Sequence, residues 1–243
     1  MREIQLRWGR RNLGFAWIFL EPLIFAMPVL TMWSFMHSGM DRGGIPFIAF
    51  MWSGYLPILM FRHVTSHCLY AIRSGGALFY HRDITPFDVV FARIGLEVIG
   101  NFSATALSFY IFYIIGVIDW PQNPSLFLLG FFYMAWWSVS VAIIVAAWSE
   151  RSDIVEHIWM PISYIYMPVS GFFYLAQWLP IPLRELALTV MPSLHCYEMI
   201  RGGLFGSRLQ VFYDLSYLSF VLAILTLFGL WMLRGVRQFI QFD

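Results

Sequence analysis

The chain is 243 residues long, and its composition excludes an ordinary soluble domain. Hydrophobic residues make up 60% of the sequence and aromatic residues 19%, whereas charged residues make up only 12%. This apolar content exceeds what one soluble core could hide, so we expect a membrane protein. The formal net charge of +1 gives no concentrated basic surface, so nucleic acid is not an expected partner.

All fifteen basic residues are arginine, and the sequence contains no lysine. A phosphate-binding loop of the G-x-x-x-x-G-K-[ST] type needs its lysine on the phosphates, and a Schiff-base enzyme needs a lysine amine. The chain therefore belongs to neither class. We expect no catalytic residues and no cofactor on it.

The N-terminal segment MREIQLRWGRRNLG is basic and precedes the first apolar run. A cleaved signal is not expected, because that run is too long and contains Glu21. Residues 1–14 predict an amphipathic helix on the membrane surface, with three apolar side chains within one narrow arc. Arg11 falls in the same arc, which weakens the apolar face. An equal alternative is that the segment is only a basic stretch that flanks the first membrane span and sets its orientation.

Apolar runs along the chain predict six membrane-spanning helices and one membrane domain over residues 1–243. The runs cover residues 15–36, 46–61, 98–118, 125–148, 158–179 and 215–233. The second helix is expected to continue to about residue 72, because FRHVTSHCLYAI contains no helix breaker.

The arginines predict the orientation of these helices. Eleven arginines lie before residue 15, between 62 and 93, at position 151 or after 233, and four lie in the other connections. By the positive-inside rule, both termini are cytoplasmic, which agrees with an even number of spans.

Three polar residues inside the predicted spans need partners. Glu21 should face the helix bundle or a cavity. Two roles for its carboxylate are equally favoured: one in the transport path, the other a hydrogen bond to a neighbouring helix. Glu97 and Asn101 lie one turn apart on one face, which favours ordinary contacts between helices.

Aromatic residues gather in the fourth and fifth spans, where they are typical of the membrane interfaces. Four of them also offer flat faces with a polar edge, on which sugar rings can slide: Tyr164, Tyr166, Tyr174 and Trp178.

Residues 178–214 predict a hairpin of two short helices, 183–190 and 193–204, neither of which can span a membrane. Irregular backbone at membrane depth is tolerated only beside protein or water, so this hairpin should line or cover an aqueous path. We expect Ser193 to cap the second helix, Gly202 and Gly203 to end it, and Glu198 to pair with Arg201.

Two histidine motifs raise the alternative of a metal site. His63 and His67 have zinc-protease spacing, but Val64 stands where the glutamate base belongs. His195 and Glu198, with Cys196 between them, resemble half of a carboxylate-bridged site, and no second half is found. We expect no metal site, and an intramembrane metalloenzyme is the remote alternative.

The order of these features resembles the ABC-2 type exporter permeases, and within them the inner-membrane subunit of group 2 capsular polysaccharide exporters. The resemblance rests on NLGFAWIFLEP, GGALFYHRDITPFDVVFARIGLE and MPSLHCYEMIRGGLFG. Two motifs carry most of it: Pro86, Asp88, Arg93 and Glu97 in the inner loop, and Pro192, His195, Glu198 and Arg201 in the outer hairpin.

The resemblance implies a homodimer in the bacterial inner membrane that docks two copies of a cytoplasmic ATPase subunit, which binds ATP and Mg. The coupling loop is expected at residues 73–93. Its contact residues would be Phe79, Tyr80, Asp83, Pro86, Phe87 and Asp88, with Asp83, Thr85 and Asp88 as candidate helix caps.

The resemblance also implies that residues 178–214 form a re-entrant periplasmic gate. The path and gate would use Glu21, Tyr164, Tyr166, Tyr174, Trp178, Arg184, His195, Glu198 and Arg201. The expected substrate is an acidic, lipid-linked capsular polysaccharide, and the expected further partners are membrane lipids, a periplasmic co-polymerase and an outer-membrane export protein. Permeases for O-antigen, nodulation factor, or another lipid or drug are the alternatives.

Overall fold

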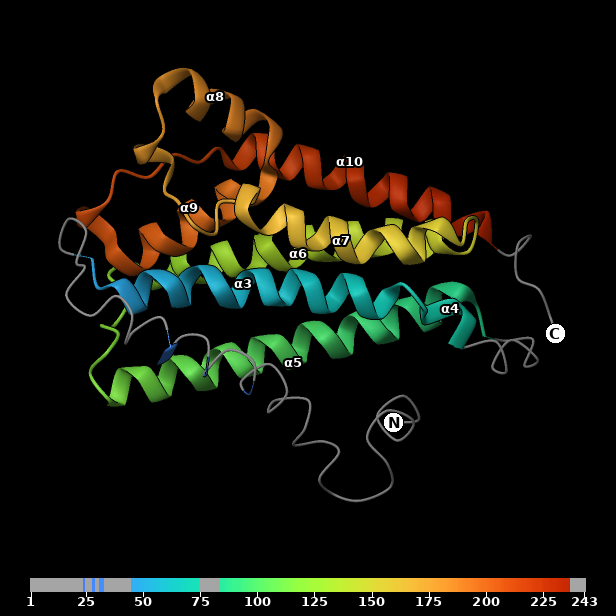
Figure 1. Cartoon of the computed structure of the whole chain (residues 1–243), viewed down its shortest axis with the longest axis horizontal. Helices are drawn as coiled ribbons and strands as arrows, with labels where there is room; N and C mark the ends of the chain where they lie inside the picture. Colours follow the sequence, from blue (N-terminus) through green and yellow to red (C-terminus); the bar gives the residue numbers. More distant parts are fainter. Residues whose placement is uncertain (1–23, 25–27, 29–30, 33–44, 75–83, 237–243) are drawn as a thin grey trace.

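The computed structural model describes residues 24, 28, 31, 32, 45–74 and 84–236 (Figure 1). Its elements there are helical: α3 (Phe47–Cys68), α4 (Ala71–Ser74), α5 (Pro86–Ile114), α6 (Pro124–Ser149), α7 (Ile154–Val169), η2 (Ala176–Trp178), α8 (Ile181–Val190), α9 (Pro192–Phe205), η3 (Gly206–Arg208) and α10 (Leu215–Arg234). Predictions for Glu21, Phe79, Tyr80 and Asp83 fall outside the described residues, as do those for residues 1–14 and most of 15–36.

Four of the described helices, α3, α5, α6 and α10, are long and apolar enough to cross a membrane. The predicted spans 125–148 and 215–233 match α6 and α10 closely, because a side chain caps each helix at its start. Asn123 accepts a hydrogen bond from the N–H of Leu126, and Asp214 accepts two from the first turn of α10.

Helix α5 begins twelve residues before the predicted span 98–118, so the expected boundary is wrong. Thr85 and Asp88 form a capping box, in which each residue's side chain accepts from the other's backbone N–H. Pro86 occupies the first turn, where its missing N–H costs nothing. Thr85 is therefore the N-cap and Asp88 is not, and residues 86–93 of the expected coupling loop 73–93 belong to α5.

The fifth predicted span, 158–179, is also wrong in its bounds, because α7 covers Ile154–Val169. The chain turns at Gly171, whose φ of +101° lies in the left-handed region that glycine adopts readily. The predicted continuation of the second helix to residue 72 holds only as far as Cys68, after which a short turn leads into α4.

Helix α6 lies at the centre of the bundle and packs against α3, α9 and α10, with α5 on the far side of α3 (Figure 1). We call the end that carries η2, α8, α9 and η3 the hairpin end. The opposite end, which carries α4 and the turn between α6 and α7, is the loop end. Helix α8 stands away from the bundle at the hairpin end (Figure 1).

Candidate functional site

Helix α9 is fully enclosed, since all fourteen of its residues are buried. Glycines allow this close packing. A Cβ on Gly203 would lie 2.3 Å from the backbone nitrogen of Phe127 in α6, and a Cβ on Gly130 of α6 would lie 2.7 Å from the backbone nitrogen of Ile200. The two backbones therefore approach closely, and a side chain at either glycine would push α9 away from α6.

His195 joins α9 to the segments before and after it in the chain. Its Nδ1 accepts a 3.0 Å hydrogen bond from the backbone N–H of Asp214, so its Nε2 donates to the carbonyl of Leu188 in α8 at 2.8 Å. Burial lowers the pKa of the imidazole, which keeps it in the neutral form that this pattern requires. Both ring nitrogens are thus occupied by backbone groups.

Glu198 lies one turn further along α9 and holds two more backbone segments. One carboxylate oxygen accepts from the N–H of Ala176 in η2 at 2.9 Å, and the other accepts from the N–H of Phe212 at 3.0 Å. Burial raises the pKa of this carboxyl group, and the two N–H donors act against that rise.

Arg201 lies one further turn along and is 0% exposed. Its guanidinium donates to the carbonyls of Gly171 at 2.8 Å and Tyr174 at 2.6 Å, and also to the carbonyl of Phe172. Its central carbon lies 4.1 Å from the centre of the Phe50 ring. Arg201 therefore fixes the turn that follows α7 onto α9 and α3.

These contacts correct three expectations about α9. The nearest polar partners of Glu198 and Arg201 are backbone groups, so the expected pair between the two side chains does not form. Ser193 is not the cap, because the helix begins after Met191, and its hydroxyl donates to the carbonyl of Ser170. Gly202 and Gly203 do not end the helix, which continues to Phe205.

The first helix of the hairpin is exposed. No residue of α8 is buried. The guanidinium of Arg184 in this helix lies 4.2 Å from the centre of the Phe212 ring. The two short helices predicted over residues 183–190 and 193–204 are thus both present as α8 and α9.

The four aromatic residues proposed for the path take different positions. Tyr164 is 58% exposed on α7, and Trp178 is exposed on η2 with its ring 5.4 Å from that of Phe50. Tyr166 is half-buried and donates to Ser193 of α9, and Tyr174 donates to the carbonyl of Val169. Tyr164 and Trp178 are exposed, whereas the other two stabilise the turn after α7.

An ionic cluster holds the loop end together. Arg73 of α4 contacts Asp153 at 2.5 Å, Glu156 at 2.6 Å and Glu150 at 3.9 Å, and so joins α4 to α6 and α7. The Arg73 side chain is 43% exposed. Burial raises the pKa of Glu150, and the nearby guanidinium acts in the opposite direction.

The polar residues of α5 act as the sequence predicts. A carboxylate oxygen of Glu97 lies 3.1 Å from Nδ1 of His67 in α3, and the Asn101 amide donates to the carbonyl of Glu97. Glu97 and Asn101 therefore serve contacts within and between helices.

Within the described ranges, no three histidine, cysteine, aspartate or glutamate residues gather in a way that could hold a metal ion. Both cysteines, Cys68 and Cys196, are buried and free.

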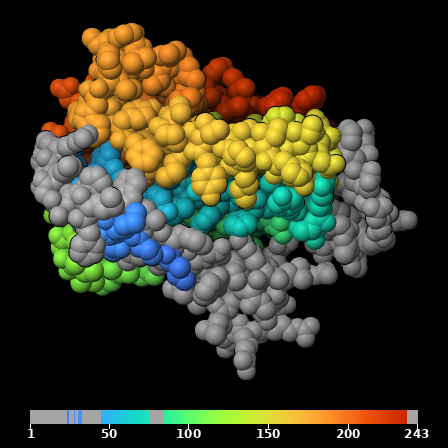
Figure 2. Space-filling view, in the orientation of Figure 1, coloured from blue at the N-terminus to red at the C-terminus, as the bar shows by residue number. Residues whose placement is uncertain are grey.

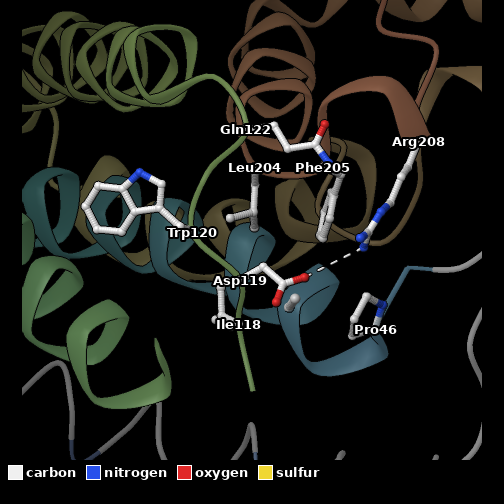
Figure 3. Close-up of a pocket in the computed structure, with 9 residues that line it drawn as sticks. Pro46, Ile118, Asp119, Trp120, Gln122, Leu204, Phe205 and Arg208 are labelled. Atoms are coloured by element: carbon white, nitrogen blue, oxygen red, sulfur yellow. Dashed lines mark ion pairs between the residues drawn. The ribbon is translucent and has the colours of Figure 1, made fainter. Parts of the chain in front are cut away.

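A small pocket opens at the hairpin end, between α3, the α5–α6 loop and η3 (Figure 3). Its lining residues are Pro46, Ala49, Ile118, Asp119, Trp120, Gln122, Leu204, Phe205 and Arg208. Arg208 lies 3.8 Å from Asp119, and the indole of Trp120 points away from that pair. The pair links the α5–α6 loop to η3.

Residues 1–205 match the family described as ABC-2 type transporter. This chain belongs to the ABC-2 type transporter family. It is 32% identical over 242 residues to the capsule polysaccharide export inner-membrane protein BexB of Haemophilus influenzae, covering 99% of this chain and 90% of that protein. It is 33% identical to the corresponding protein CtrC of Neisseria meningitidis serogroup A, covering 95% of this chain and 86% of that one.

A shorter similarity links this ABC-2 protein to the polysialic acid transport protein KpsM of Escherichia coli. There the identity is 33% over 98 residues, which cover 40% of this chain and 37% of KpsM. All three relatives carry names that refer to polysaccharide or polysialic acid transport.

Two arginines of this ABC-2 protein have contacts that the sequence alone did not reveal. Arg73 was counted only as a basic loop residue, although it gathers three carboxylates at the loop end. Arg62 was counted among the arginines of the cytoplasmic side, and it lies inside α3, within the predicted continuation of the second helix.

Proposed function

We propose that this chain is the permease subunit of an ATP-driven ABC exporter that moves a capsular polysaccharide, acidic and lipid-linked, across the bacterial inner membrane. The observation that carries this proposal is the similarity to BexB and CtrC over nearly the whole chain. ATP and Mg belong to a separate ATPase subunit, because the chain has no lysine for a phosphate-binding loop.

In this proposal the loop end faces the cytoplasm and docks the ATPase. The contact includes residues 73–85 and the first turn of α5, where Asp88 is exposed and Phe87 is half-buried. Arg73 joins α4 to the turn between α6 and α7. The connection from α3 to α5 and the connection from α6 to α7 therefore move as one unit. Two copies of the chain and two ATPase subunits form the exporter, with both termini of each chain in the cytoplasm.

The hairpin end then faces the periplasm, where α8 and α9 form the gate. His195, Glu198 and Arg201 act by fixing α9 to three backbone segments, so we assign them to gate stability. Tyr164 and Trp178 are the exposed residues among the four aromatics, and we assign them to contacts with sugar rings. A periplasmic co-polymerase and an outer-membrane export protein would receive the polymer beyond this end.

The proposal is tested with the full chain and its ATPase subunit reconstituted together in lipid vesicles. We expect ATP hydrolysis to rise when the capsular glycan is supplied, and the polymer to accumulate on the far side of the membrane. A chain that purifies as a stable monomer without an ATPase partner would contradict the proposal.

Asp88→Arg probes the docking role at the loop end. It replaces an exposed acidic group by a basic one and removes half of the capping box. We expect export to be lost while the dimer still assembles, as measured by transport and by size-exclusion chromatography. Asp88→Asn is the matched control for loss of the charge alone, and normal export by Asp88→Arg would contradict the assignment.

A further inference from the structure

Arg62 lies inside the membrane-spanning helix α3, six residues before its end at Cys68. At 1.5 Å per residue, this places it about 9 Å from the loop end. The Cα–Cβ bonds of a helix tilt toward its N-terminus, which for α3 is the hairpin end. The side chain therefore leans toward the middle of the bundle rather than toward the headgroups at the loop end.

The guanidinium of Arg62 is stacked on an aromatic ring of another helix. Its central carbon lies 3.8 Å from the centre of the Tyr164 ring, and that tyrosine is 58% exposed on α7. This geometry is a cation–π contact, which holds the charge in place and leaves the edge of the planar fork free for an acceptor.

The buried Nε of Arg62 is not satisfied within the described part of the chain, where it has no hydrogen-bond partner. An intramembrane arginine is costly, so it faces a partner or a water-filled cavity. The buried Nε of Arg201 is also without a partner, but the terminal nitrogens of Arg201 donate to three carbonyls. Arg73 contacts three carboxylates, whereas Arg62 donates no hydrogen bond within the described part of the chain, so its terminal nitrogens retain capacity for an anion.

Aromatic side chains extend from Arg62 toward the hairpin end, where Phe50 and Phe172 are buried. Tyr55 lies seven residues before Arg62, which places it on the same face of α3, and its ring is 6.1 Å from that of Phe172. Phe50 and Trp178 follow at the hairpin end, 5.4 Å apart. Helices α3 and α7 adjoin on the face shown in Figure 2.

We propose that Arg62, held by Tyr164, is a contact site for the acidic groups of a glycan in transit, namely sugar carboxylates or bridging phosphates. Aromatic faces suit the rings of any sugar, whereas a guanidinium fork accepts a planar carboxylate or a phosphate through paired hydrogen bonds. This inference rests on the proposed export function and adds a residue that selects for charge.

The test compares polysialic acid with the same polymer after chemical reduction of its carboxyl groups to alcohols, so that the two probes differ only at the carboxyl positions. The protein is the full chain with its ATPase subunit, in vesicles of phosphatidylcholine. We expect wild type to bind the acidic form about tenfold more tightly, as one charge-assisted hydrogen-bond pair allows. Arg62→Gln should bind both forms equally.

Further variants separate this site from a general loss of folding. Arg62→Lys keeps the charge without the planar fork and should retain part of the preference. Tyr164→Leu should weaken the preference, and Tyr164→Phe should keep it, since the ring remains. Arg234→Gln removes one exposed arginine at the end of α10 and should bind as wild type does.

A second measurement tests whether an aqueous path reaches Arg62. A hydrophilic arginine reagent, p-hydroxyphenylglyoxal, should label Arg62 in the assembled exporter, and polysialic acid but not its reduced form should protect it. Mass spectrometry of the digested chain reports the label. Absence of label at Arg62, with Arg234 labelled, would overturn the proposal because no aqueous path would reach the site.

Other outcomes show whether the Arg62 site or the proposed export function is wrong. If Arg62→Gln keeps the preference for the acidic polymer, the site is wrong and the export function stands. Protection of Arg62 by phosphatidylglycerol in place of polymer would show that the site binds lipid, which also overturns the proposal. If neither polymer changes ATP hydrolysis in wild type or variants while Arg62 is labelled, the proposed export function is the part that fails.

Discussion

Arginine fixes both ends of α7, but it does so with different partners. At the hairpin end, Arg201 is fully buried and donates to three neutral backbone carbonyls. At the loop end, Arg73 is 43% exposed and meets three carboxylates. Buried hydrogen bonds to carbonyls are hardly screened by salt, whereas exposed ion pairs are. The hairpin end should therefore be rigid and insensitive to salt, and the loop end adjustable.

The largest effect is expected for Arg201→Gln, which removes most of the donors to the carbonyls of Gly171, Phe172 and Tyr174. Leaving several buried acceptors unpaired should lower the free energy of unfolding by about 3 to 5 kcal/mol. Denaturant unfolding in detergent measures this loss. Arg184→Gln is the matched control, because that guanidinium lies over one ring, Phe212, on an exposed helix. Equal stability of the two variants would contradict a clamp at the hairpin end.

The next effect tests whether α9 is held by close packing as well as by polar contacts. In Gly203→Val the new side chain meets the backbone of Phe127, which cannot rotate away, so we expect a loss of about 1 to 3 kcal/mol. Gly95→Ala on α5 is the control, because nothing lies within 4 Å of its Cβ and alanine favours a helix. The control should gain stability by up to about 1 kcal/mol, and a loss in both variants would point to a general effect.

The sequence predicted what depends on local pattern, and it missed what depends on contacts between distant segments. Long apolar runs located α6 and α10 closely. The end of α7 was missed because Gly171 interrupts a run that stays apolar. Glu198 and Arg201 were expected to pair because spacing along one helix is visible in a sequence, whereas the carbonyls that they meet come from loops whose position is set by tertiary packing.

At the loop end, Arg73→Gln should lower the free energy of unfolding by about 0.5 to 2 kcal/mol at low salt, since its ion pairs are partly exposed and each contributes little. At 1 M NaCl the Debye length falls to about 3 Å, so the difference from wild type should nearly vanish. The loss caused by Arg201→Gln should persist at the same salt. A loss from Arg73→Gln that salt does not change would remove the contrast between the two ends.

The double variant Arg73→Asp with Asp153→Arg sharpens this test. It restores one pair with the charges exchanged, although the new aspartate then faces Glu150 and Glu156. We expect only partial rescue compared with Arg73→Asp alone, measured as unfolding free energy and as ATP hydrolysis with the ATPase subunit. Full rescue would show that the cluster acts through the single contact with Asp153.

The smallest effect concerns the pair of Arg208 and Asp119 at the mouth of the pocket. Their side chains are 44% and 78% exposed and lie 3.8 Å apart, so solvent screens most of the attraction. Asp119→Asn should change the free energy of unfolding by less than about 0.5 kcal/mol. This pair lies at the hairpin end but is exposed, as Arg73 is at the loop end. It therefore separates the effect of position at the hairpin end from the effect of burial. A loss as large as that of Arg201→Gln would show that position at the hairpin end, rather than burial of the arginine, determines how strongly these contacts hold the fold.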